Sequence, residues 1–154
     1  MHIPDGYLGP YTYIAMWIIM ISIRYYAGKK LSSELKSRQV PLLALAAAFS
    51  FVIMMFNVPI PGGSTGHAVG AAIVGIVLGP WAGVIAISVA LVLQALMFGD
   101  GGITAIAANC FNMAVVMPFV GYYVYKIISG STDITSSRRV IAAAIAGYIS
   151  LTIA

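Results

Sequence analysis

The sequence predicts an all-α, polytopic integral membrane bundle that forms a single transmembrane domain over residues 1–154. Of its 154 residues, 61% are hydrophobic and 8% are charged, whereas soluble proteins have about 45–50% and about 25%. Apolar runs of roughly the length that crosses a bilayer alternate with polar, glycine-rich or proline-rich segments. The basic residues gather near two of these connecting segments. These observations exclude a soluble globular domain, and the single cysteine excludes an internal disulfide.

Six apolar runs predict six membrane spans, at residues 11–26, 40–56, 67–78, 81–98, 103–125 and 140–154. The first run begins after Gly9-Pro10, and the polar stretch 28–39 ends it. The second tolerates Pro41 in its first turn, where a proline removes no helical hydrogen bond. The segment 57–66 that follows is rich in proline and glycine, so we expect a loop there.

The later runs differ in length. The run 67–78 ends before Gly79-Pro80, so it is either short, strongly tilted or completed by the preceding loop folding into the protein. The glycine-rich loop 99–102 separates the fourth and fifth runs. The sixth run would cover only about 22 Å, less than the hydrocarbon core of a bilayer. Either a terminus lies nearby or the sequence is part of a longer protein, and we favour the second interpretation.

The basic residues set the predicted orientation. All eight lie in or beside the first and fifth connections: Arg24, Lys29, Lys30, Lys36, Arg38, Lys126, Arg138 and Arg139. Alternating spans place both clusters on one side, which the positive-inside rule makes cytoplasmic. The N-terminus and the loops 57–66 and 99–102 then share the outer face. The net charge of +4 is therefore a topology signal, and we expect membrane lipid but no nucleic acid as a partner.

Residues 1–10 are predicted to form an external segment that captures a metal ion. The α-amine of Met1, the amide nitrogen of His2 and the His2 Nδ1 can close a five-membered and a six-membered chelate ring. The other histidine of the chain, His67, falls on the same predicted face and offers a fourth nitrogen. Four nitrogens that include an ionised amide suit the square-planar preference of Ni²⁺ or Cu²⁺, and acid weakens such binding. The alternatives are an exposed terminal His2 and a His67 that bonds a nearby carbonyl at a helix start.

Four polar residues are candidates for a supporting layer around these ligands: Asp5, Ser64, Asp100 and Asn109. Asp100 could complement a cation or accept a hydrogen bond from a ligand histidine. Ser64 could cap the helix expected to begin near His67. Asn109 lies inside an apolar span, where amides usually face the bundle interior. Its alternative role is a hydrogen bond between helices.

Ala44 and Ala48 give the second span a surface of small residues. Small residues four positions apart allow another helix to approach closely. The helix that packs there could belong to a partner protein or to this chain.

The sequence carries no sign of an enzyme. It has no His-Glu-x-x-His motif, no Gly-x-Ser-x-Gly motif and no nucleotide-binding loop. Any process driven by ATP would therefore need a separate ATPase chain.

The chain resembles the CbiM/NikM family over nearly its whole length. Four segments carry the resemblance: Met1-His2-Ile3-Pro4-Asp5-Gly6-Tyr7-Leu8, Gly62-Gly63-Ser64-Thr65-Gly66-His67, Leu78-Gly79-Pro80-Trp81, and Phe98-Gly99-Asp100-Gly101-Gly102-Ile103-Thr104-Ala105 to Asn109-Cys110-Phe111-Asn112-Met113. Members of this family are the substrate-binding (S) membrane components of energy-coupling-factor (ECF) transporters for cobalt and nickel. They usually exceed 200 residues and have about seven helices, so this chain would lack part of the sixth helix and a seventh.

The resemblance implies a metal site built from the Met1 amine, the His2 amide and imidazole, and His67. It also implies a multi-pass protein of the prokaryotic inner membrane that transports Ni²⁺ or Co²⁺ and holds no intrinsic cofactor. The implied partners are a coupling membrane subunit, ATPase subunits that hydrolyse the ATP and, as a further candidate, a small accessory membrane subunit. Docking would use small-residue surfaces such as Ala44 and Ala48.

Nickel is the expected cargo, because a square-planar field of four nitrogens favours d⁸ Ni²⁺. Co²⁺ could enter the same ligands with a different spin state or with added ligands, and Cu²⁺ would bind still more tightly. Two other functions stay open: a membrane scaffold that binds no metal, and a vitamin-binding component of similar architecture.

Overall fold

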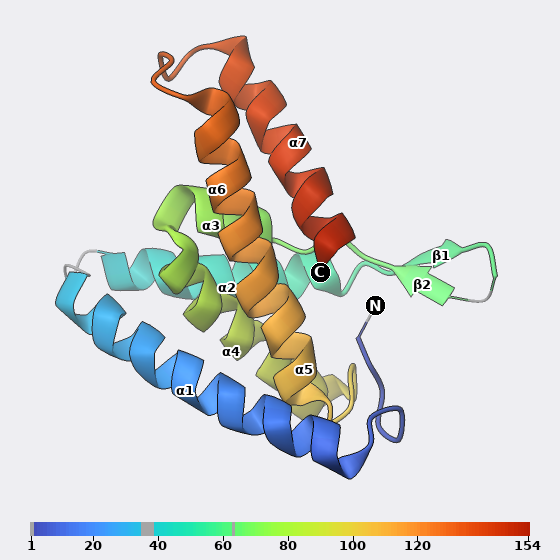
Figure 1. The fold of residues 1–154 in the computed structure, drawn as a ribbon. Coiled ribbons are helices and arrows are strands. Elements are labelled where there is room, and N and C mark those ends of the chain that lie inside the picture. Colours follow the sequence, from blue (N-terminus) through green and yellow to red (C-terminus); the bar gives the residue numbers. More distant parts are fainter. Residues whose placement is uncertain (1, 35–38, 63) are drawn as a thin grey trace.

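The computed structural model describes residues 2–34, 39–62 and 64–154, of which Figure 1 shows the arrangement. The chain is mostly helical, with 74% of its residues in helices. In chain order the elements are α1 (Pro10–Glu34), α2 (Val40–Met54), β1 (Val58–Ile60), β2 (Ser64–Gly66), α3 (Ala71–Leu78), α4 (Pro80–Phe98), α5 (Ile106–Cys110), the π-helix η2 (Phe111–Val116), α6 (Met117–Ser129) and α7 (Ser137–Ile153). The elements α5, η2 and α6 follow one another without a break.

Helix α4 lies at the centre of the fold and contacts α1, α2, α3, α5, η2 and α6. Its buried residues include Ala82, Ala86 and Ala90, spaced four apart, which lets the neighbouring helices approach closely. Pro80 starts α4 and Gly99 ends it in the left-handed conformation, as expected for the two ends of a helix. Gly79, with a φ of 91°, separates α3 from α4. The expected boundaries of the fourth run are therefore confirmed to within one residue.

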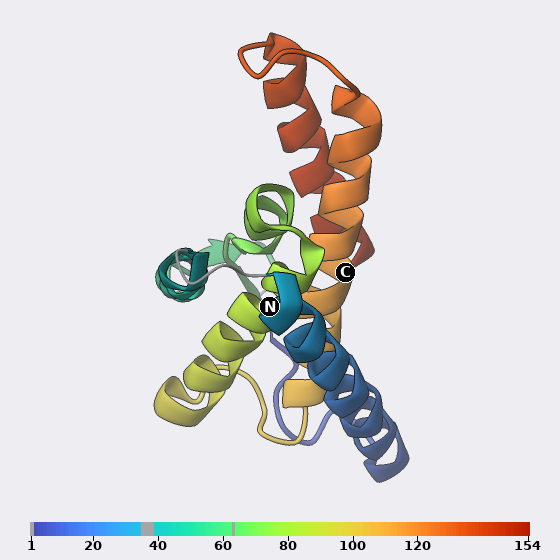
Figure 2. The same ribbon diagram turned by 90° about the vertical axis from the view of Figure 1, so that its left-hand side faces the viewer.

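Helices α6 and α7 form an antiparallel pair that rises beyond the other helices in both Figure 1 and Figure 2. Helix α6 also packs on α3, where Gly75 lies against the backbone of Pro118. A Cβ at Gly75 would lie 2.6 Å from the carbonyl oxygen of Pro118 and 2.9 Å from its Cα. Since these are backbone atoms, a side chain could be accommodated only by moving one helix away from the other.

The substitution Gly75→Ala is expected to destabilise the protein by about 1–3 kcal/mol, because it overpacks the contact between α3 and α6. Thermal unfolding of the purified protein in detergent measures this as a lower Tm. Gly28→Ala in α1 is the matched control, because a Cβ there meets no atom within 4 Å. Equal Tm values for the two variants would contradict the tight packing at Gly75.

Three local expectations are wrong. Helix α1 continues to Glu34 and does not end at the polar stretch, because Ala27 and Leu31 lie one turn apart and are both buried. The expected loop 57–66 contains an antiparallel hairpin in which Val58 pairs with Gly66, so the fold is not purely α-helical. Helix α3 begins at Ala71, which leaves His67 in the irregular segment between β2 and α3.

The structure does not confirm the predicted number of six membrane spans. In the described parts of the chain, α4 and the continuous run Ile106–Ser129 are long and apolar enough to cross a membrane, and α2 is a shorter apolar helix. The eight residues of α3 would cover only about 12 Å. Large apolar side chains such as Ile18, Leu45 and Val140 are 63%, 67% and 72% exposed, as expected where lipid covers a helix.

Two groups of residues lie at different ends of the helix bundle. Lys30 near the end of α1 lies 5.5 Å from the ring centre of Trp81 at the start of α4, and Trp81 packs edge-on against Phe119 of α6. His2, His67 and Asp100 meet elsewhere, beside the last turn of α4. Of the eight basic residues, Lys36 and Arg38 lie outside the described residues. Arg24 differs from the lysines of α1, since its guanidinium contacts Cys110.

Candidate metal centre

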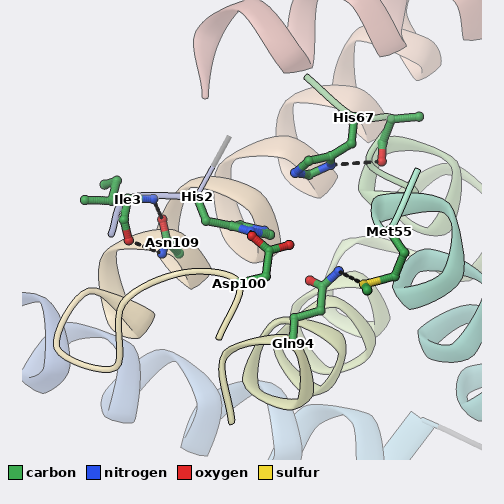
Figure 3. Close-up of polar contacts among 8 residues, drawn as sticks. His2, Ile3, Met55, His67, Gln94, Asp100 and Asn109 are labelled. Carbon is green, nitrogen blue, oxygen red and sulfur yellow. Dashed lines mark hydrogen bonds and ion pairs between the residues drawn. The ribbon is translucent and has the colours of Figure 1, made fainter. Parts of the chain in front are cut away.

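The N-terminal segment lies across the loop between α4 and α5, where the side chain of Asn109 holds it. The amide of Ile3 donates to Asn109 Oδ1 at 2.8 Å, and Asn109 Nδ2 donates to the Ile3 carbonyl at 3.1 Å (Figure 3). The same carbonyl accepts a hydrogen bond from Gly102 N at 3.0 Å. Asn109 is 4% exposed, so both polar ends of a buried side chain are satisfied by the residue next to His2. Asn109 therefore holds the N-terminal segment and does not form the hydrogen bond between helices that was its alternative role.

Asp5 fixes the same segment at a second point. Its carboxylate accepts hydrogen bonds from Ile103 N at 3.1 Å and Thr104 N at 2.8 Å, and from the Thr104 hydroxyl at 2.5 Å. The hydroxyl and amide of Thr104 lower the pKa of Asp5 below its usual 3.8. Asp5 therefore stays ionised at neutral pH and closes the turn that leads into α5.

Two glycines make room for this docking. Gly101 has a φ of 96°, and a Cβ on it would lie 3.1 Å from Cβ of His2. A Cβ on Gly102 would collide with the backbone nitrogen of Asp5, and it would lie 2.6 Å from Asp5 Oδ1 and 2.7 Å from the Pro4 carbonyl carbon. The close approach of the two segments thus requires glycine at position 102.

His2, His67 and Asp100 meet beside this docked segment. His2 Nδ1 lies 2.8 Å from Asp100 Oδ1, and the His2 side chain is only 2% exposed. The ring centres of His2 and His67 are 5.0 Å apart, and the two rings extend towards each other in Figure 3. The structure therefore brings together two histidines and an aspartate from three separate parts of the sequence.

The hydrogen bonds fix which ring nitrogens are available. A carboxylate can only accept, so His2 Nδ1 carries a proton towards Asp100, and His67 Nδ1 donates in the same way to the Ala68 carbonyl at 3.3 Å. In the neutral rings, both Nε2 atoms then present lone pairs, and both are buried without a hydrogen-bond partner. Two buried, unpartnered imidazole nitrogens at such close range fit a bound cation, since buried polar atoms normally have partners.

The electrostatic surroundings keep His67 neutral. Burial is the largest effect and lowers the pKa of His67 below its usual 6.5. The hydrogen bond to the Ala68 carbonyl opposes this shift only in part, and the neighbouring His2 adds to the lowering. A neutral imidazole is the form that binds a metal.

The structure describes only part of the predicted set of metal ligands. They contain no group of three or more His, Cys, Asp or Glu side chains arranged to hold a metal. Four-nitrogen binding would therefore need backbone nitrogens as well as the two imidazoles. Met1 lies outside the described residues, as does the side chain of Ser64. A chelate through the His2 amide and Nδ1 also requires Nδ1 to turn away from Asp100.

Gln94, which is not among the predicted ligands or their supporting residues, lies beside the candidate site. It is fully buried, its carbonyl accepts a hydrogen bond from Asp100 N at 3.2 Å, and its side chain rises from α4 towards the same region (Figure 3). Its Nε2 contacts Met55 Sδ at 3.9 Å, whereas its Oε1 has no partner. Its position as the one amide within the fourth apolar run was the available signal.

Ala44 and Ala48 lie away from this centre. Both are exposed and line a groove of about 480 Å³ between α2 and α4, together with Val89 and Leu93. The small-residue surface is therefore open along part of its length and is not completely filled by helices of this chain.

Known proteins of one family match this chain over almost its whole length. The family described as "Cobalt uptake substrate-specific transmembrane region" matches residues 2–154. A fused nickel transport protein of Rhodobacter capsulatus is 55% identical over 98% of this chain and 44% of its own length. A cobalt transport protein of Acetoanaerobium sticklandii is 38% identical over 83% of this chain and 54% of its own. A putative metal transport protein of Methanocaldococcus jannaschii is 51% identical over 98% of this chain and 66% of its own.

Solved structures show the same similarity. The crystal structure of a truncated transition metal transporter superimposes with a TM-score of 0.87 at 47% identity, over 98% of this chain and 69% of that one. The chain thus spans roughly half to two thirds of the length of these curated relatives.

Proposed function

The chain belongs to the CbiM family of cobalt uptake substrate-specific transmembrane regions, and we propose that it captures Ni²⁺ for import through its N-terminus and two histidines. The family's members are membrane components of nickel and cobalt transport. The observation that carries the proposal is the meeting of His2 and His67, whose ring centres are 5.0 Å apart, with the His67 Nε2 buried and without a hydrogen-bond partner. The cation is the cargo of the protein and not a resident cofactor.

The proposed ligands are the Met1 amine, the His2 amide nitrogen and imidazole, and His67. The docking of Ile3 and Asp5 supports this set, because it fixes the backbone that follows the chelating amide and so lowers the entropic cost of binding. In the six-membered ring, His2 Nδ1 would bind the cation in place of its contact with Asp100, and the Nδ1 proton would move to Nε2 of the same ring. The released carboxylate then faces a bound dication, which it stabilises by charge.

Nickel is the proposed cargo in preference to cobalt. A planar field of four nitrogens stabilises d⁸ Ni²⁺ more than Co²⁺. Two relatives whose names specify nickel are 55% and 50% identical to this chain, while a relative named for cobalt is 38% identical. Cu²⁺ should bind the same ligands more tightly, so selectivity in a cell also depends on the supply of each metal.

Metal analysis and absorption spectroscopy of the purified protein with its native N-terminus test the proposal. The expected result is one Ni²⁺ per chain in a yellow, diamagnetic complex, as planar four-nitrogen coordination requires. A paramagnetic octahedral nickel complex would contradict the ligand set. Unchanged thermal stability after Ni²⁺ addition, with no retained metal, would instead favour a scaffold function.

The wider assembly is also part of the proposal. The metal-binding end faces outwards and the Lys30–Trp81 end faces the cytoplasm, since the basic residues cluster near the latter. The chain then acts as the S component of a multi-pass ECF importer in a prokaryotic inner membrane, with residues 1–10 as its external capturing segment. A coupling membrane subunit and ATPase subunits supply the energy, and a small accessory membrane subunit is a further candidate. The groove at Ala44 and Ala48 is the proposed docking surface for the coupling subunit.

Nickel affinity should fall as the pH is lowered from about 7.5 to about 5.5, because protons compete for the imidazoles and for the amide nitrogen. The metal-free protein should lose stability over part of the same range. His67 has a lowered pKa in the folded state, so below about pH 6.5 the unfolded chain binds more protons than the folded one. The stability is therefore complete above that pH and declines as the pH falls through the folded pKa.

Calorimetric titration with Ni²⁺ at several pH values, in buffers of different ionisation enthalpy, measures both the affinity and the protons released. The variant His67→Ala is the control. It should bind Ni²⁺ much more weakly and release fewer protons on binding than the unmodified protein. An affinity that stays constant between about pH 7.5 and about pH 5.5 would contradict imidazole and amide ligands.

A further inference from the structure

Arg24 carries a positive charge into the interior of an apolar fold. Its Nη2 donates to Cys110 Sγ at 2.9 Å, and its Nε is buried without a hydrogen-bond partner. A thiol is a weak acceptor with no formal charge when protonated, whereas an arginine side chain stays charged in proteins. The contact with Cys110 therefore orients the guanidinium without neutralising it.

In the described part of the chain, no carboxylate contacts Arg24. The whole sequence has four acidic residues, and two of them are engaged at the metal centre: Asp5 with Thr104 and Asp100 with His2. Glu34 is ten residues further along the same helix, or about 15 Å away along its axis. The fourth, Asp133, lies in the connection between α6 and α7. Among the residues that the structure describes, Arg24 accordingly forms no ion pair.

An unpaired arginine within a membrane helix is costly, by roughly 2.5–3.5 kcal/mol at the centre of an inserted helix. Arg24 lies fourteen residues after the start of α1 and ten before its end. Both ends of the helix are thus about 15 Å or more away along its axis, so Arg24 lies well inside α1 and not at its cytoplasmic end. The counter-charge should come from a protein side chain at the same depth.

The surface beside Arg24 has the shape for such a partner. Arg24 and the buried Ser88 line a groove of about 260 Å³ whose other walls are apolar: Ile85, Val89, Val92 and Leu93. Val89 and Leu93 are 46% and 41% exposed, and they also line the second groove, at Ala44 and Ala48. The two grooves therefore flank one exposed ridge of α4. An apolar surface with a single buried cation is complementary to a transmembrane helix that presents a single carboxylate.

We propose that Arg24 forms an intersubunit ion pair with an Asp or Glu on a transmembrane helix of the coupling membrane subunit, seated in the groove between α1 and α4. The inference rests on the proposed function for the existence of that subunit, but it does not depend on the metal site. The small-residue groove gives close packing, whereas the ion pair fixes the depth and register of the helix. Arg24 thereby becomes a specificity determinant of assembly.

Co-purification of the coupling subunit with the tagged protein, from cells that express the complete transporter, tests this pair. The variant Arg24→Gln should reduce the co-purified subunit by about tenfold or more, because it leaves the partner's carboxylate buried and unpaired. Lys29→Gln, which removes an exposed positive charge from the same helix, should have no effect. Arg24→Lys should restore part of the assembly, since it keeps the charge. Full assembly of Arg24→Gln would overturn the proposal.

Two further measurements separate this role from the alternatives. The isolated Arg24→Gln protein should keep the Tm and nickel affinity of the unmodified protein, whereas a purely structural arginine would lower the Tm. A photo-crosslinking residue in place of Val89 should attach to the coupling subunit in the assembled transporter. Crosslinks only to a second copy of this chain, or assembly that depends on Arg24 only in anionic lipid nanodiscs, would overturn the proposal. Assembly without nickel binding would refute the metal site and leave this interface intact.

Discussion

A protein with two extra residues before Met1 is expected to lose at least about 100-fold in Ni²⁺ affinity, more than the usual cost of removing a partner that only supports a ligand. The extension converts the Met1 amine into an amide and moves His2 away from the chain terminus. It thus removes one of the four nitrogens and breaks the five-membered ring. Isothermal titration of the purified protein measures the loss.

The matched control carries the same residues after Ala154, at the other end of the described chain. It should bind Ni²⁺ like the unmodified protein, since the added residues leave the amine free. Both proteins should also unfold at the same temperature without metal, because Ile3 and Asp5 still reach Asn109 and Thr104. Equal nickel affinity in the two extended proteins would refute the N-terminal chelate while leaving the rest of the fold unquestioned.

The substitution Gly102→Ala is expected to weaken Ni²⁺ binding by about 10–100-fold, the range found when the support of a metal ligand is lost. The new Cβ would collide with the backbone nitrogen of Asp5 and approach the Pro4 carbonyl carbon to 2.7 Å. The N-terminal segment would have to lift from the loop, and the bonds of Ile3 and Asp5 would weaken with it. Competition with a coloured nickel chelator measures the affinity.

Gly147→Ala in α7 is the control for this experiment, because a Cβ at that position meets no atom within 4 Å. Asp5→Asn provides a second route to the same displacement without a steric clash, since it removes the charge that accepts the bonds from Ile103 and Thr104. Both site variants should bind nickel more weakly than Gly147→Ala. If Gly102→Ala bound nickel as tightly as this control, docking of the segment would not contribute to capture.

The sequence could predict the broad arrangement, because hydropathy and charge act over long stretches. Counting spans and basic residues places His2, His67 and Asp100 on one face, and the structure brings these three together. Glycine and proline predict the ends of α4, since their effect on the backbone is local. These parts of the fold depend on composition and neighbouring residues alone.

The parts that could not be predicted depend on contacts between distant residues. Asn109 holds Ile3 across 106 positions, and no local pattern distinguishes this amide from one that joins two helices. The extension of α1 to Glu34 depends on the burial of Ala27 and Leu31, which hydropathy of the segment does not reveal. Each strand of the hairpin, Val58–Ile60 and Ser64–Gly66, has only three residues. Such strands are too short to show the alternation of apolar and polar residues in the sequence.

The docking of the first residues onto Asn109 and Thr104 also imposes an order on biosynthesis. Asp100 is synthesised 98 residues after its partner His2, and Asn109 is synthesised 106 residues after Ile3. At about 5–20 residues per second, the N-terminal segment waits roughly 5–20 s before its binding surface exists. During that interval the segment has no docking partner from the later part of the chain. The docked N-terminal segment can therefore form only after synthesis has passed residue 109.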